Sequence, residues 1–139
     1  MKKLNNKGFS LVELIIVIAI MAVLIGILAP QFLRYVEKSR IQKDETAIEE
    51  LRKACEVALA NEQVAKSVGT ESFPYSIAIN NTGAFTIGNA ALNTEVLATI
   101  GDSTLKFTSN LYTGSTGTTV DITRLTDGYK VTAVLLSGV

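Results

Sequence analysis

The first 30 residues contain one long apolar run. Residues 9–29 are apolar except for Ser10 and Glu13, and as an α-helix they extend about 31 Å, the thickness of the hydrocarbon layer of a bilayer. Three lysines precede the run, namely Lys2, Lys3 and Lys7. The positive-inside rule therefore predicts a membrane-spanning helix with its N-terminus in the cytoplasm and the rest of the chain on the far side.

The helical pattern continues beyond the apolar run. Residues 31–66 lack Gly and Pro and are rich in Ala, Glu, Lys, Leu and Arg, which favours helix. Apolar residues recur there at spacings of three and four and form one stripe, which contains Ile48, Leu51, Cys55, Ala58 and Leu59. Charged residues follow the other side. The stripe predicts that a second layer of structure covers this part of the helix.

The composition changes after Val68 and Gly69, where Thr, Ser, Asn and Gly dominate and favour β-structure. The clearest hairpin pairs residues 120–125 with 129–136 across Thr126, Asp127 and Gly128. The Asp-Gly pair supplies the positive φ angles of a tight turn. The remaining segments predict a third strand at residues 104–112, a short helix at 90–101 and a loop at 114–119.

These elements predict an α+β fold in which one long N-terminal helix has a membrane-spanning first half. Its second half packs at residues 45–65 against a small antiparallel β-sheet head. The inward positions of the sheet are Val120, Ile122, Val131, Ala133 and Leu135. The predicted divisions are 1–8, a short leader; 9–30, the hydrophobic helix; 31–66, the amphipathic helix; and 67–139, the β-rich head.

Charge and chemistry narrow the possible functions. Thirteen Lys and Arg balance thirteen Asp and Glu, so there is no net field to attract nucleic acid. The chain has no His and a single Cys, which excludes an internal disulfide and the commonest general base. Cys55 lies on the apolar stripe and is expected to be a small buried hydrophobe. We predict no catalytic residue, metal site or cofactor.

Two further patterns carry little weight. Asn80, Asn81 and Thr82 form a glycosylation sequon, a triplet that also occurs by chance. Asp121 and Asp127 are too few and too scattered for a calcium loop, which needs several oxygen ligands. Turn and surface roles are expected for both carboxylates.

Glu13 is the residue that conflicts with its surroundings. An ionised carboxylate within the bilayer costs roughly 2.5 to 3.5 kcal/mol unless a partner neutralises it. The apolar run contains no basic residue, so the partner must be another molecule or a charge created by processing. A cut between Gly8 and Phe9 would place a new α-amino group four residues from Glu13. That amine could reach Glu13 within one helix or between staggered neighbouring helices.

Simpler targeting segments explain the N-terminus less well. A secretory signal peptide has an apolar region of 7 to 15 residues followed by a small-x-small cleavage site. Here the run is longer, and Ile27 and Pro30 flank the only candidate, Ala29. An uncleaved signal anchor accounts for the hydrophobicity and the lysines. It does not explain why Gly8, Glu13 and the amphipathic helix after the apolar run are present.

The stretch "GFSLVE", from the end of a short basic leader into the apolar run, resembles a type IV prepilin. The resemblance implies a pilin fold, cleavage after Gly8 by a membrane-embedded prepilin peptidase and N-methylation of Phe9. It also implies that Glu13 neutralises the amine of an adjacent subunit during assembly. Gly26 and Pro30 weaken the helix, and residues 22–30 are expected to unwind on assembly, as in similar filaments. The C-terminal disulfide of many type IV pilins is impossible here.

The resemblance predicts a structural subunit rather than an enzyme. The major pilin of a type IV pilus would wait in the cytoplasmic membrane and then polymerise into a surface filament. Its partners would be further copies of itself, the prepilin peptidase, the inner-membrane assembly platform, a motor ATPase and the lipid bilayer. The alternative is the major pseudopilin of a type II secretion or DNA-uptake system, which shares the leader, the acid and the helix. A membrane-anchored enzyme or ligand-binding module lacks any supporting motif.

Overall fold

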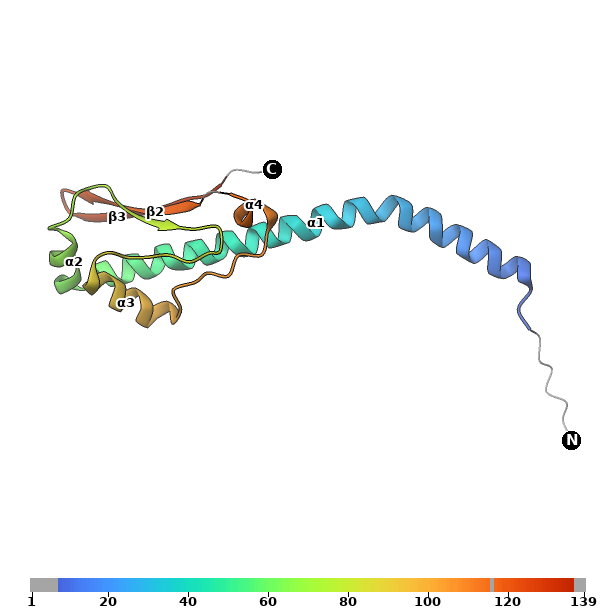
Figure 1. The fold of residues 1–139 in the computed structure, drawn as a ribbon, viewed down its shortest axis with the longest axis horizontal. Helices are drawn as coiled ribbons and strands as arrows, with labels where there is room; N and C mark the ends of the chain where they lie inside the picture. Colours follow the sequence, from blue (N-terminus) through green and yellow to red (C-terminus); the bar gives the residue numbers. More distant parts are fainter. Residues whose placement is uncertain (1–7, 116, 137–139) are drawn as a thin grey trace, which may run out of the picture. The chain divides into compact units, whose positions relative to one another are not determined.

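The computed structural model describes residues 8–115 and 117–136. Its elements are α1 (Leu11–Leu59), α2 (Glu62–Val68), β1 (Tyr75–Ile79), α3 (Ala90–Ile100), α4 (Asn110–Thr113), β2 (Thr118–Leu125) and β3 (Gly128–Val134) (Figure 1). The chain divides into two units at residues 36 and 37, so α1 contributes its first part to one unit and its second part to the other. Lys2, Lys3 and Lys7 lie outside the described residues.

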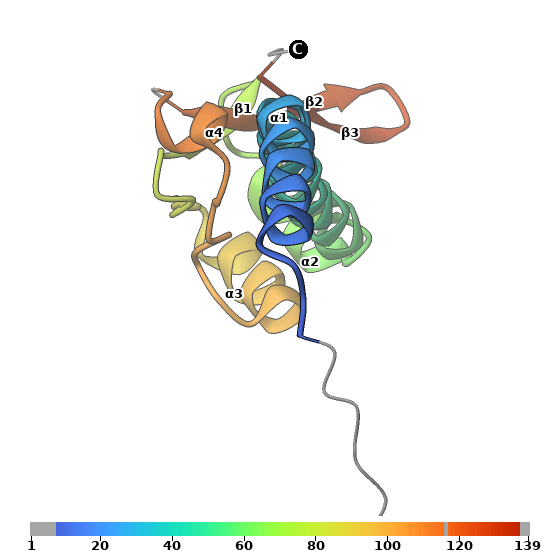
Figure 2. The same cartoon turned by 90° about the vertical axis from the view of Figure 1, so that its right-hand side faces the viewer.

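The second unit confirms the predicted α+β class. Its three strands form one antiparallel sheet in the order β1-β2-β3. Within this unit, α1 lies between the sheet on one side and α3 on the other (Figure 2). The sheet and α3 therefore cover the apolar stripe of α1 from two sides.

The predicted C-terminal hairpin is confirmed. Leu125 of β2 pairs with Gly128 of β3, which leaves Thr126 and Asp127 as the turn. The prediction that both residues of the Asp-Gly pair have positive φ was wrong. Gly128 has φ of 145°, whereas Asp127 keeps a negative φ. Only Gly128 therefore needs the conformational freedom of glycine.

The third strand lies elsewhere than predicted. Within residues 104–112, Thr104 forms one isolated bridge with Ala84, Lys106 has a positive φ of 54°, and α4 begins at Asn110. The third strand is instead β1, which pairs with β2 from Tyr75↔Ile122 to Ile79↔Thr118. The physical reason is that residues 108–110 bind carboxylates of α1, as described below, and are not available for a strand.

The long helix ends earlier than the pattern predicted. It stops at Leu59, and a second helix, α2, begins at Glu62. Asn61 separates the two because its side-chain oxygen accepts a hydrogen bond from the Gln63 N–H at 3.0 Å, an N-cap that starts a new helix. The predicted helix at residues 90–101 is confirmed as α3, with Asn89 as its N-cap and Gly101 in the left-handed region as its C-cap.

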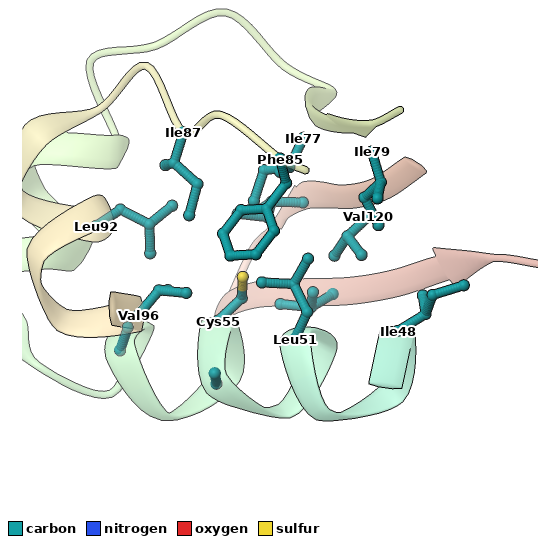
Figure 3. Packing of buried hydrophobic residues seen from close by; sticks show 14 of the residues in the cluster. Ile48, Leu51, Cys55, Ile77, Ile79, Phe85, Ile87, Leu92, Val96 and Val120 are labelled. Carbon is teal, nitrogen blue, oxygen red and sulfur yellow. The ribbon is translucent and has the colours of Figure 1, made fainter. Parts of the chain in front are cut away.

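The core forms around the helix stripe. The predicted stripe residues are buried, and the Cys55 sulfur points toward the ring of Phe85 (Figure 3). Leu92 and Val96 of α3 lie on one side of Cys55 and Val120 of β2 on the other. The expectation that Cys55 is a buried hydrophobe is confirmed, and burial raises the pKa of its thiol to about 12.

The inward face of the sheet follows the prediction until β3 ends. Val120, Ile122 and Val131 are buried and Ala133 is half-buried. Leu135 was predicted to point inward, but it is exposed because β3 ends at Val134 and the alternation of the strand ends with it. Leu136 packs against the core in its place.

Candidate functional site

The apolar side chains of the first part of α1 are exposed. Among the large apolar residues between positions 9 and 28, exposure ranges from 49% for Val17 to 90% for Phe9. This helix is long and apolar enough to cross a membrane, and none of its most apolar 18-residue segment is buried within the chain. Such a surface is unstable in water and requires a bilayer or other helices around it.

Glu13 folds back onto the start of this helix. Its Oε2 atom accepts a hydrogen bond from the backbone N–H of Ser10 at 2.8 Å. Ser10 directly precedes the first helical residue, and the Leu14 N–H bonds to its carbonyl at 3.2 Å. Glu13 therefore supplies the carboxylate half of a capping box. Its charge lies in the first turn of α1, four residues after Phe9 in the sequence.

The capping role of Glu13 did not emerge from the sequence analysis, although the signal was present. Ser10 and Glu13 have the S-x-x-E spacing that marks a helix start. The structure thus gives this carboxylate one partner within its own chain. Its other oxygen, Oε1, accepts no hydrogen bond from the described residues.

The same segment is similar to known proteins. The family model described as the prokaryotic N-terminal methylation motif matches residues 3–29. Two relatives, both named type IV major fimbrial protein FimA, come from Dichelobacter nodosus. One is 36% identical over 66 residues and the other 39% identical over 59 residues.

The resemblance to type IV pilins is thereby confirmed. The two matches cover 48% and 42% of this chain, and the chain spans only 42% and 36% of the relatives' own length. No solved structure matches this chain. The similarity therefore rests on less than half of each relative.

In the pilin-like N-terminal unit, the fold itself does not require glycine at either predicted site. A Cβ atom added at Gly8 or at Gly26 would meet no other atom within 4 Å, and Gly26 has no positive φ. Pro30 lies inside α1, which is helical from Leu11 to Leu59 in the single chain. Any need for Gly8 or Gly26 must therefore come from contacts with other molecules or from a conformational change.

The head is fastened to α1 by a buried carboxylate that the sequence analysis did not single out. Asp44 is only 1% exposed. Its Oδ1 accepts from the Thr108 N–H at 3.0 Å, and its Oδ2 accepts from the N–H and hydroxyl of Ser109 at 2.8 and 2.6 Å. Glu37, about two turns earlier, accepts from the Asn110 N–H. Asp44 thus binds the two residues before α4, and Glu37 binds its first residue. The positive end of a helix favours negative charge at this place.

Proposed function

We propose that this chain is the major structural subunit of a type IV pilus. In this proposal it is cleaved between Gly8 and Phe9, N-methylated at Phe9 and polymerised through its N-terminal helices into a surface filament. The observation that carries the proposal is the exposed apolar surface of residues 9–29, directly after a cleavage-like Gly-Phe pair within the matched motif.

The physical basis of assembly is burial of this surface. Apolar area removed from water contributes about 25 cal/mol per Å², but a subunit that leaves the bilayer exchanges lipid contacts for helix contacts. The net gain is much smaller than the gross burial, and association also costs rigid-body freedom. A motor ATPase acting through an inner-membrane platform would supply the work of extraction, so both are proposed partners.

The proposed role of Glu13 is to set the register between subunits. Cleavage would give Phe9 a positive amine, and Glu13 already points to the start of the helix. Its Oε1 accepts no hydrogen bond from residues 8–115 and 117–136, which leaves one acceptor for the amine of the same or a neighbouring subunit. A pair between neighbours, shielded from water by the apolar helices, would strongly favour one axial offset between them.

Gly26 and Pro30 have a separate proposed role. Glycine lowers helix stability by about 1 kcal/mol relative to alanine, and proline removes one backbone hydrogen bond. Both residues lie in an unbroken helix in the single chain, so melting of residues 22–30 would belong to the assembled filament. An unwound stretch would lengthen the first part of the chain as helices pack together.

The alternative, a major pseudopilin, uses the same cleavage and helix packing. Both relatives are named as fimbrial proteins, which supports the pilus over the pseudopilus. Long surface fibres at native expression favour the pilus. A secretion defect without visible fibres favours the pseudopilus.

Mass spectrometry of the protein sheared from the cell surface tests the proposal. We expect an N-terminal peptide that begins at methylated Phe9 and lacks the three leader lysines. Surface polymer that retains the leader contradicts it. Cleaved and methylated protein found only in the membrane fraction, without surface polymer, contradicts filament assembly while leaving the processing intact.

A further inference from the structure

A cluster of basic residues follows the apolar part of α1. Lys38, Arg40 and Lys43 are exposed. Ser39, Arg40 and Lys43 line an open groove of about 460 Å³ whose other wall is Thr108. We call the three cations and this groove the basic collar.

The acidic residues nearby only partly offset this charge. Glu37 lies 3.8 Å from the Arg40 guanidinium, but it also accepts from the Asn110 N–H. Asp44 is buried, and its two oxygens are hydrogen-bonded to Thr108 and Ser109. Neither Lys38 nor Lys43 forms an ion pair with any described residue. From Arg34 to Glu45, four Lys and Arg residues face three Asp and Glu residues, so this part of α1 keeps a net positive charge of one.

The wall of the groove is held in place. Thr108 donates its backbone N–H to both oxygens of Asp44, at 3.0 and 3.1 Å, and its hydroxyl to Oδ1 at 3.2 Å. This fixes the loop against α1 beside Arg40 and Lys43. An anion entering the groove meets a surface that is already formed, which lowers the entropy cost of binding.

The position of the basic collar along the helix identifies its partner. Phe32, Leu33 and Tyr35 are all more than 60% exposed, and an aromatic residue after an apolar run is typical of a membrane interface. Lys38 follows Tyr35 by three residues, a rise of about 4.5 Å, and Lys43 by eight, a rise of about 12 Å. With Tyr35 at the interface, lipid phosphates would lie within reach of these long side chains.

We propose that the basic collar binds the phosphate groups of anionic lipids in the leaflet where α1 leaves the bilayer. The binding requires membrane insertion of α1, but neither cleavage at Gly8 nor polymerisation. It would hold the base of the head at the membrane surface before assembly. A second copy of the chain offers few carboxylates on α1 for this purpose, because Glu49 and Glu56 are already paired with Arg52 of their own chain and Glu50 is the exposed one left between them.

Spin-label electron paramagnetic resonance on the full chain in phosphatidylcholine vesicles tests this proposal. The measured quantity is the association of spin-labelled phosphatidylglycerol relative to spin-labelled phosphatidylcholine. Lys2, Lys3 and Lys7 are first changed to Gln, so that the leader does not bind anionic lipid. We expect at least a twofold preference for phosphatidylglycerol, which falls to about one in K38Q/R40Q/K43Q.

A matched control removes the same charge elsewhere. Lys53, Arg124 and Lys130 are exposed cations that form no ion pair with the described residues, and K53Q/R124Q/K130Q should keep the preference. An equal loss of preference in this control would show that lipid association depends only on net charge, and it would overturn the proposal. The proposal would also be overturned if the parent showed no preference for phosphatidylglycerol, or if the preference survived in K38Q/R40Q/K43Q. Abolition of the preference by 10 mM inorganic phosphate at constant ionic strength would overturn it as well. Filament yield does not enter this measurement, so failure here leaves the proposed pilus function untouched.

Discussion

Ser109 donates both its backbone N–H and its hydroxyl to one oxygen of Asp44, at 2.8 and 2.6 Å. The two residues are 65 positions apart in the sequence, yet both are buried. Charge-assisted hydrogen bonds of this kind are among the strongest that a protein makes. They join the loop before α4 to the long helix.

Asp44→Ala should destabilise the head because it leaves the N–H groups of Thr108 and of the buried Ser109 without their acceptor. We expect a loss of about 3 kcal/mol in the free energy of unfolding, measured by denaturant titration of the full chain in detergent. Glu50→Ala removes an exposed carboxylate from the same helix and should cost less than roughly 0.5 kcal/mol. Equal effects of the two substitutions would contradict the anchoring role of Asp44.

Tyr129 limits what can replace Gly69. The Tyr129 hydroxyl donates to the Ala65 carbonyl at 2.7 Å, and a Cβ atom at Gly69 would lie 2.9 Å from that hydroxyl. Gly69 has an ordinary helical φ of −61°, so the obstacle is contact rather than backbone strain. Gly69→Ala should cost about 1 kcal/mol in the parent and markedly less in the Tyr129→Phe background. A double-mutant cycle measures this coupling, and strict additivity would exclude the contact.

The stability of the head should fall in alkaline solution partly through Cys55. Burial, with a smaller contribution from the Glu56 carboxylate, raises the pKa of the thiol from 9.0 to about 12. The unfolded chain releases this proton above pH 9, whereas the folded chain retains it until about pH 12. This contribution to stability is therefore intact below pH 9 and is lost between pH 9 and 12.

Comparison with Cys55→Ala isolates this contribution from other groups that titrate in the same range. Between pH 8 and 10.5 the parent should lose about 2 kcal/mol more unfolding free energy than the alanine variant. Denaturant titrations of both proteins at the two pH values measure the difference. Parallel losses would mean that the thiol ionises as readily in the folded state as in the unfolded state.

Substitutions of Glu13 separate its local role from its proposed role in assembly. Glu13→Gln keeps an oxygen that can accept from the Ser10 N–H, but it removes the charge, while Glu13→Ala removes both. We expect both variants to insert into the membrane and both to lose most of the surface filament, as measured by shearing and immunoblotting. Normal filament yield from Glu13→Gln would show that capping, rather than charge, is what assembly needs.

Gly8→Ala should block processing without disturbing the fold. A methyl group there meets nothing within 4 Å, so retention of uncleaved precursor on a gel would reflect recognition by the peptidase. Gly26→Ala is the matched control, because its surroundings in the single chain are equally open. We expect normal cleavage of that variant. Accumulation of precursor in both would instead indicate a general defect of membrane insertion.

Local patterns predicted much of this fold. The stripe that contains Leu51 and Cys55 follows the helical period, and the turn before Gly128 has its own sequence signal, so both were recognisable without the structure. The strand β1 was missed although Tyr75, Ile77 and Ile79 alternate after a proline. Residues 104–112 carry a similar apolar content, and only the contacts with α1 decide between the two segments.

The functional and structural sites also differ in how far the sequence alone reveals them. Gly8, Phe9 and Glu13 form a contiguous motif, so the sequence alone identified them as candidates. Asp44 could not be found like this, because it lies among charged residues that resemble a solvated helix face. Its partners are 64 and 65 positions away. A long-range contact of this kind leaves no periodic signal in the sequence.

The carboxylates of Glu37 and Asp44 also determine how the head would respond to mechanical force. A pull along α1 from its N-terminal end reaches Glu37 before it reaches the stripe at Leu51 and Cys55. The first bonds to be sheared are then those to Asn110, Thr108 and Ser109, which are few and strong. Detachment of α4 would thus precede rupture of the core, so the head would yield in two steps under tension.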